Sequence, residues 1–243
     1  MSTTLNRRTA MIAVFTERYV LSLVYLYLTW MEFQKPWLGW NGQRATEGAV
    51  VVQTSRHLTQ VLLFFFTALL LLLARRAAVP PRRIKGILIP LATTFFTLTY
   101  SAVPWLPAAL QKNLCPAGWQ MPATIAAIVL IIIGPAIALW GILYLGRSFG
   151  IFVEVRKVVI GGPYRWVRHP MYLGWICLCA GNALGFFSGA YFILVTIHIL
   201  LLRYRARLEE AELSEYSADY REYLKRTGFV FPRFRRPAGN AKT

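Results

Sequence analysis

The stretch Gly161–Trp175, GGPYRWVRHPMYLGW, places two arginines, a histidine and two prolines directly before a long apolar run, 171–202. Gly185 and Ser188-Gly189 interrupt that run, so we expect a helix, a tight turn and a second helix. Each arm then has about 16 residues, or roughly 24 Å of helix. A bilayer core is about 30 Å thick, so each arm barely spans it. The charged stretch is therefore the entry to a short membrane hairpin.

The composition of the whole chain agrees with a membrane protein. The 243 residues include 27 Lys+Arg against 10 Asp+Glu, a net charge of +17, and 56% are hydrophobic. This is too apolar for an ordinary soluble domain, whereas a nucleic-acid-binding protein would combine a soluble fold with a basic stripe. We therefore expect no nucleic-acid partner. The three cysteines cannot make a disulfide framework, and no metal site is predicted.

Apolar periodicity predicts an all-α integral membrane fold. It indicates four transmembrane helices followed by the short C-terminal hairpin, five to six membrane helices in all, at about 10–31, 58–74, 84–103, 122–145 and 171–202. We divide the chain into 1–121, which holds the first three helices and their loops, and 122–243, which holds the fourth helix, the hairpin and the tail. Segment 204–226 is expected to be a cytoplasmic amphipathic helix that extends the second arm, and the tail after Pro232 is expected to be mobile or bound to headgroups.

The loops alternate in charge, which indicates the orientation. The N-terminus, loops 75–85 and 146–169, and the tail 203–243 hold 22 of the 27 basic residues, whereas 32–57 and 104–121 hold four. Basic loops face the cytoplasm in multi-pass membrane proteins. We therefore expect both termini to be cytoplasmic.

The two ends of a hairpin meet. Pro170 suits the first turn of a helix, and the exit RYRARLEE brings back an arginine and two glutamates. We expect the entry residues to face the exit residues: Tyr164, Arg168, His169 and Tyr172 on one side, Arg205, Glu209 and Glu210 on the other. Arginines and aromatic residues at this depth often serve only as interfacial anchors. Carboxylates have no anchoring use beside anionic headgroups, so the combination favours a pocket for a polar ligand.

The same residues carry a resemblance to a known family. GGPYRWVRHPMYLGW, followed by RLEEAEL and DYREYLKRT, resembles the isoprenylcysteine carboxyl methyltransferases and their phospholipid N-methyltransferase relatives over roughly 146–234. The resemblance implies a multi-span helical enzyme that uses S-adenosylmethionine (SAM). It implies cofactor contacts from Glu154, Tyr164, Arg168, His169, Pro170, Met171, Tyr172 and Glu209, with the neighbouring Glu210 as the alternative in an uncertain register, and it places Arg205 on the substrate side as the catalytic residue.

The chemistry of SAM fits these residue types. The cofactor needs a carboxylate for its ammonium group, a cation for its carboxylate, and aromatic walls for its sulfonium and adenine. The acceptor is expected to be lipophilic, lipid-linked or resident among the membrane lipids, and most like an isoprenylcysteine carboxylate. A phospholipid amine or a small amine or thiol is the alternative.

A non-enzymatic role is the competing hypothesis. The hairpin could be part of a membrane scaffold or a small transporter. Transporters place charge and broken helices at mid-membrane, whereas this chain keeps its charge at one face. The pattern indicates no particular oligomeric state.

Overall fold

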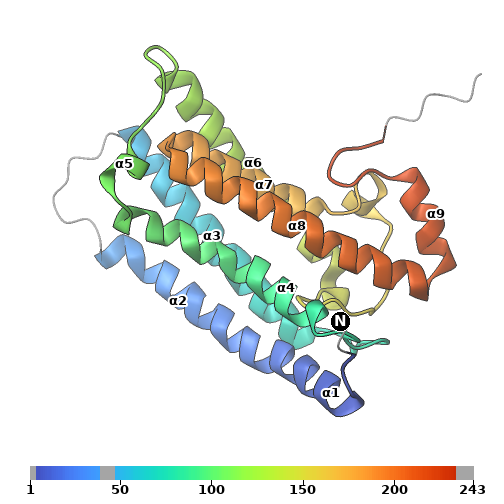
Figure 1. Ribbon diagram of the computed structural model, residues 1–243. Helices are drawn as coiled ribbons and strands as arrows, with labels where there is room; N and C mark the ends of the chain where they lie inside the picture. The colour runs from blue at the N-terminus through green and yellow to red at the C-terminus, as the bar shows by residue number, and fades with distance from the viewer. Residues whose placement is uncertain (1–3, 39–46, 234–243) are drawn as a thin grey trace, which may run out of the picture.

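The computed structural model describes residues 4–38 and 47–233, and every named element in these ranges is a helix (Figure 1). In chain order they are α1 (Arg7–Phe15), the π-helical η1 (Thr16–Leu21), α2 (Ser22–Leu38), α3 (Glu47–Leu73), α4 (Lys85–Phe95), the 3₁₀-helical η2 (Phe96–Trp105), α5 (Ala108–Gln111), α6 (Gln120–Leu145), η3 (Gly146–Ser148), η4 (Gly162–Arg165), α7 (Pro170–Phe186), α8 (Gly189–Tyr216) and α9 (Ala218–Arg226). The predicted all-helical class is thus confirmed.

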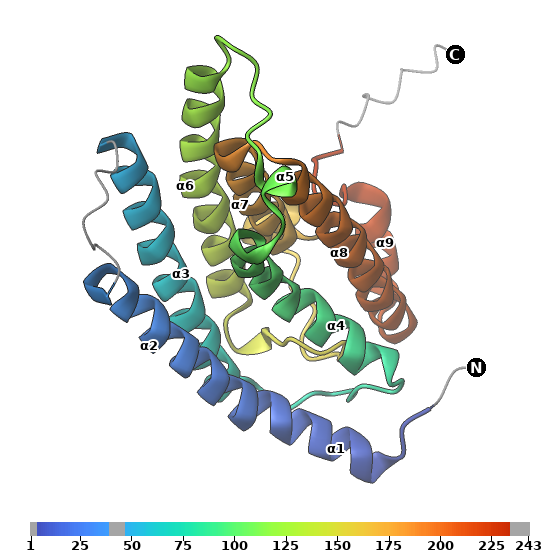
Figure 2. The same ribbon diagram turned by 60° about the vertical axis from the view of Figure 1, so that its left-hand side comes forward.

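Among the described residues, three helices are long and apolar enough to cross a membrane: Arg7–Gln34, Gln120–Ser148 and Gly189–Tyr216. Two further apolar helices, His57–Leu73 and Pro170–Phe186, are shorter. The expected span 84–103 is divided between α4 and η2. Figure 2 shows α1 and α2 running on as one long helix, with η1 as a π-helical segment inside it. π-Bulges of this kind often mark functional sites.

The basic segments that the sequence places on one side of the membrane lie together in space. The amide of Leu5 donates to the carbonyl of Arg82 at 2.8 Å, and the amide of Val79 donates to the carbonyl of Val155 at 3.1 Å. These bonds join the N-terminus, the loop before α4 and the loop after α6 at one end of the bundle, where α9 also lies (Figure 1). Their cytoplasmic location stays a prediction.

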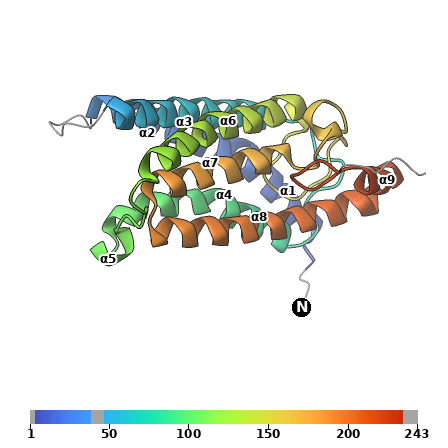
Figure 3. The same cartoon turned by 90° about the horizontal axis from the view of Figure 1, so that it is seen from above.

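The predicted hairpin is present, and it packs closely on α6. α7 begins at Pro170 with His169 at its N-cap, and α8 begins at Gly189 after a two-residue turn. A Cβ on Gly134 would come within 2.7 Å of the carbonyl oxygen of Gly174, so only glycines allow the two backbones this approach. Small residues at such contacts are typical of membrane helix pairs. Figure 3 shows α6 on one side of α7 and α8 on the other.

The expected single helix over 204–226 is wrong. α8 continues to Tyr216, and Ser217 then has extended dihedrals (φ −134°, ψ 125°). Its hydroxyl accepts a hydrogen bond from the amide of Tyr220 at 3.3 Å, which makes it the N-cap of α9. Serine at this position favours a new helix start. α9 is itself amphipathic, with Tyr220 and Tyr223 buried. The predicted mobile tail lies, from residue 234 on, outside the described residues.

Candidate functional site

Two pockets adjoin the mouth of the hairpin. The first, which we call the charged pocket, is formed by the loop after α6, the start of α7, the C-terminal half of α8 and α9; its lining includes Glu154, Arg156, Lys157, Tyr164, Arg168, His169, Met171, Tyr172, Glu209, Tyr220 and Tyr223. The second, the apolar pocket, lies inside the bundle; its lining includes Tyr25, Phe64, Thr67, Thr93, Thr94, Thr97, Phe149, Met171, Tyr172, Trp175, His198 and Arg205.

Glu210 clamps the entry of the hairpin to its exit. Its Oε1 accepts hydrogen bonds from Arg168 Nε at 2.7 Å and lies 3.0 Å from His169 Nε2. Arg168 also donates to the carbonyl of Leu224 at 3.3 Å. Glu210 does not line the charged pocket. Glu210 therefore has a structural role: with Arg168 it connects the two arms of the hairpin to α9.

Glu209, one residue earlier, points to different partners. Its Oε1 accepts from the Tyr172 hydroxyl at 2.5 Å and from Arg205 Nε at 2.9 Å. Arg205 is buried, and its other nitrogens donate to Thr94 Oγ1 at 3.2 Å and to the carbonyl of Ile151 at 2.7 Å. Three of the five guanidinium N–H groups of Arg205 thus connect α8, α4 and the loop after α6. Glu209 faces the charged pocket, whereas Arg205 faces the apolar pocket.

A second group of charges lies on the opposite wall of the charged pocket. The Glu154 side chain is 1% exposed and Arg156 4% exposed, and Arg156 Nη2 lies beside Glu154 Oε1. Apart from this ion pair, neither Glu154 oxygen accepts a hydrogen bond, and Arg156 Nε and Nη1 have no hydrogen-bond partner. Burial, followed by repulsion from Glu17, raises the pKa of Glu154 to about 9, against the opposing effect of Arg156. Buried polar atoms without partners are rare, so this wall is suited to a polar ligand.

Glu17 connects this wall to the first helix. It lies in η1, is fully buried, and accepts hydrogen bonds from the amides of Ile151 and Phe152 at one oxygen and from Arg156 Nη2, at 2.8 Å, at the other. A carboxylate held by two amides and a guanidinium fixes the position of the loop that carries Glu154.

The tyrosines of the charged pocket are held by burial. Tyr223 donates its hydroxyl to the carbonyl of Tyr164 at 2.5 Å, which ties α9 to η4. Burial, with added repulsion from Glu209, raises the pKa of Tyr164 well above its usual range. The Tyr164 hydroxyl therefore stays protonated and able to donate.

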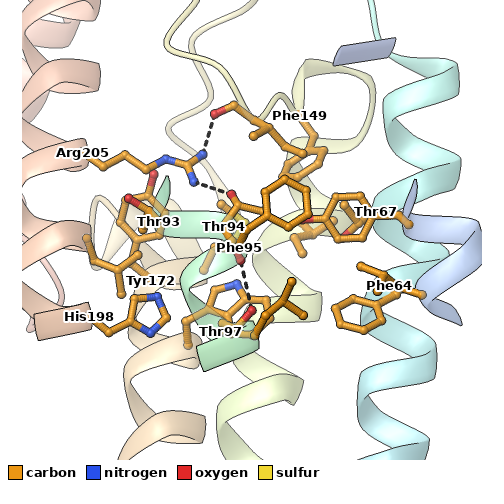
Figure 4. A pocket seen from close by; sticks show the side chains of 18 residues that line it. Phe64, Thr67, Thr93, Thr94, Phe95, Thr97, Phe149, Tyr172, His198 and Arg205 are labelled. Atoms are coloured by element: carbon orange, nitrogen blue, oxygen red, sulfur yellow. Dashed lines mark hydrogen bonds between the residues drawn. The ribbon is translucent and has the colours of Figure 1, made fainter. Parts of the chain in front are cut away.

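The apolar pocket has one polar end. Figure 4 shows Arg205 at that end, His198 and Thr97 farther along, and Phe64 and Thr67 across the cavity. His198 Nδ1, on α8, lies 3.4 Å from Cys179 Sγ, on α7, and His198 also lines the pocket. Among the described residues, no Asp or Glu lines this cavity.

The two pockets share a wall. Met171 and Tyr172 line both, and the bond between Glu209 and Arg205 passes from one to the other. A ligand in the charged pocket and a second ligand in the apolar pocket would therefore meet across Tyr172. Met171 and Tyr172 therefore separate the two cavities.

The structure brings together most of the residues singled out from the sequence. The predicted meeting of the entry and exit residues is confirmed: Tyr172 donates to Glu209, and His169 lies beside Glu210. The charged pocket is lined by Glu154, Tyr164, Arg168, His169, Met171, Tyr172 and Glu209, whereas Pro170 and Glu210 stand outside the given lining and Arg205 lines the apolar pocket. The cofactor and catalytic roles of these residues stay predictions.

Sequence reasoning missed Glu17 and the side chain of Arg156. An acidic residue inside an apolar helix is a functional candidate by default, and that signal could have identified Glu17. Nothing in the sequence shows that Arg156, among several basic neighbours, is the one that turns inward.

A family model supports the resemblance. Residues 122–218 match the model described as phospholipid methyltransferase, whereas no curated protein matches the chain. The matched range contains Glu154, the hairpin and Glu209; Glu17 and the helices before α6 lie outside it. From α6 to the end of α8 the chain is therefore similar to the phospholipid methyltransferase family.

Proposed function

We propose that this protein is a membrane methyltransferase that takes its methyl group from SAM and transfers it to a lipophilic acceptor. The observation that carries the proposal is the pair of adjoining pockets, one charged and one apolar, on either side of Tyr172. The family match supports the methyltransferase class. A scaffold has no need for buried, unsatisfied charges on the wall of a pocket, such as those of Glu154 and Arg156.

The charged pocket fits SAM by its chemistry. The cofactor has an ammonium group, a carboxylate and a sulfonium, and the pocket offers the carboxylates of Glu154 and Glu209 and the free guanidinium N–H groups of Arg156. Tyr164 and Tyr172 supply aromatic faces that suit a cation. When bound, SAM supplies an electrophilic methyl group, and the electron pair of its carbon–sulfur bond stays on sulfur.

The apolar pocket fits the acceptor. It lies among the membrane helices, so a molecule that enters it must be lipid-like. At the polar end of this pocket, Arg205 pairs with Glu209 beside the wall that the two pockets share. We assign Arg205 to orienting the acceptor's polar head, which is a positioning task that favours the transfer without a proton donor.

A carboxylate is the acceptor that this pocket favours. Arg205 lines this pocket, and its remaining N–H groups can donate to an anionic head, whereas the nearby carboxylate of Glu209 already pairs with Arg205 and does not line the pocket. A carboxylate is nucleophilic at neutral pH without a base, whereas an amine or thiol must first lose a proton. Transfer to a carboxylate gives a neutral ester and releases no proton.

We further propose that the protein spans the membrane with both termini, and hence the charged pocket, in the cytoplasm. The clustering of the basic segments at the end that holds this pocket supports the orientation. A C-terminal reporter that is active only outside the cytoplasm would contradict it.

The function is tested by supplying the purified protein with methyl-labelled SAM and a total lipid extract, followed by mass spectrometry of the labelled products. We expect a labelled lipophilic methyl ester that mild alkali hydrolyses. A labelled phospholipid amine would show that the acceptor is an amine, which is the alternative, and not a carboxylate. No labelled product in the presence of bound SAM would overturn the methyltransferase assignment.

A further inference from the structure

The buried charges behind the charged pocket do not balance. Glu17 and Glu154 are two carboxylates, and the guanidinium of Arg156 contacts both. All three side chains are at least nine-tenths buried, with exposed fractions of 0%, 1% and 4%. Water therefore does little to screen this group, which we call the acidic triad. When both carboxylates are ionised, the triad has a net charge of −1.

The two carboxylates share one guanidinium nitrogen, because Arg156 Nη2 lies beside Glu154 Oε1 and 2.8 Å from Glu17 Oε2. Glu17 uses both of its oxygens, one for two loop amides and one for Arg156, and it is fully satisfied. Glu154 lines the pocket, and apart from the ion pair with Arg156 neither of its oxygens accepts a hydrogen bond. Because Glu154 lines the pocket and Glu17 does not, the unbalanced negative charge of the triad faces the pocket at Glu154.

We propose that the acidic triad makes the pocket selective for a cationic cofactor over its neutral product, with Glu154 facing the ligand and Glu17 acting as the positioning residue that keeps Arg156 from neutralising it. This rests on the proposed function. SAM has one positive charge more than S-adenosylhomocysteine (SAH), the product left after methyl transfer, because only SAM has a sulfonium. An unscreened negative charge therefore stabilises bound SAM more than bound SAH.

The protonation of Glu154 follows from the same arrangement. Burial and Glu17 raise the pKa of Glu154 to about 9, so the carboxyl holds a proton in the ligand-free pocket at neutral pH. A bound cation favours the ionised form and displaces that proton. The other charged groups that line the pocket are Lys157, Arg168, His169 and Glu209, and all of them are equally present when SAH binds. SAM should consequently release more protons on binding than SAH does.

The test compares two isotherms in each of four proteins. SAM and SAH binding are measured by titration calorimetry, in buffers of different ionisation enthalpy, for the wild type, Glu154→Gln, Glu17→Gln and Glu222→Gln. Glu222 is a solvent-exposed carboxylate on α9 that pairs with Lys225, so its variant makes the same change in net charge away from the pocket.

We expect Glu154→Gln and Glu17→Gln each to lower the preference for SAM over SAH by about tenfold, because either change brings the triad to neutrality. The excess proton release with SAM should disappear in both variants. Glu222→Gln should keep the wild-type preference and proton count. SAH binding also reports whether each variant is folded.

A merely structural role for Glu17 would weaken SAM and SAH by the same factor and leave the preference unchanged, which would overturn the inference. If Glu17→Gln does not fold, an unchanged preference in Glu154→Gln overturns it equally. A wild-type protein that binds neither SAM nor SAH contradicts the proposed function itself. Binding of both molecules with no change of preference in the Glu154 and Glu17 variants contradicts only the further inference.

Discussion

Substitution of Glu209 by glutamine separates the two glutamates at the hairpin exit. Glutamine keeps the side-chain shape and an oxygen that can accept the bonds from the Tyr172 hydroxyl (2.5 Å) and Arg205 Nε (2.9 Å). It removes the negative charge that faces the charged pocket. Glu210→Gln is the matched control, since Glu210 faces Arg168 and His169 instead.

The structure sets the size of the two effects. A hydrogen bond to a charged group contributes about 1.5–3 kcal/mol, so loss of the Glu209 charge should weaken SAM binding roughly 10- to 150-fold. Glu210→Gln removes the charge from a partly buried clamp, so it should lower the free energy of unfolding by about 2–3 kcal/mol. SAM affinity should change much less in that variant.

The assay is a SAM titration of each detergent-purified variant, combined with its thermal unfolding. The expected pattern is weaker SAM binding in Glu209→Gln and nearly unchanged SAM binding in Glu210→Gln, with a loss of stability in both variants because each glutamate pairs with a mostly buried arginine. A loss of SAM affinity confined to Glu210→Gln would refute the assignment and show that Glu210, not Glu209, is the carboxylate that binds SAM.

Three further results are expected. Because the pKa of Glu154 is raised from 4.5 to about 9 in the folded protein, the folded state holds a proton that the unfolded state releases; ligand-free stability should therefore fall as pH rises between those values, and Glu154→Gln should flatten this slope in melting curves. Gly174→Ala should cost about 1–3 kcal/mol of unfolding free energy, whereas Gly189→Ala, whose Cβ meets nothing within 4 Å, should not; equal melting points would contradict the close packing. Tyr223→Phe should cost about 1 kcal/mol through the lost bond to Tyr164 and raise the SAM dissociation constant with little effect on turnover at saturation; unchanged stability and affinity would refute that role for α9.

The hairpin was predictable because its signals are local. Gly185 and Ser188-Gly189 interrupt an apolar run, and Pro170 begins a helix, so the sequence alone places the two ends of the hairpin side by side. The pairing of Tyr172 with Glu209 follows from that closure. Likewise, the four-residue spacing of Arg205 and Glu209 predicts their contact on one helix face.

The contacts between distant segments were not predictable. Glu17 is far from the loop after α6 in sequence, and their meeting depends on how the first helix packs against the bundle. The break at Ser217 was missed because the apolar periodicity continues across it, whereas the capping hydroxyl decides where α9 begins. The apolar pocket was also missed, since helices from both halves of the chain line it.

Equilibrium binding of radiolabelled SAM to the purified wild-type protein tests the central claim most directly. The account predicts saturable binding at one site per chain, competition by SAH, and a marked loss in Glu209→Gln. Absence of saturable binding by folded protein, or binding that Glu209→Gln and Glu154→Gln leave unchanged, would contradict the assignment of the charged pocket to SAM.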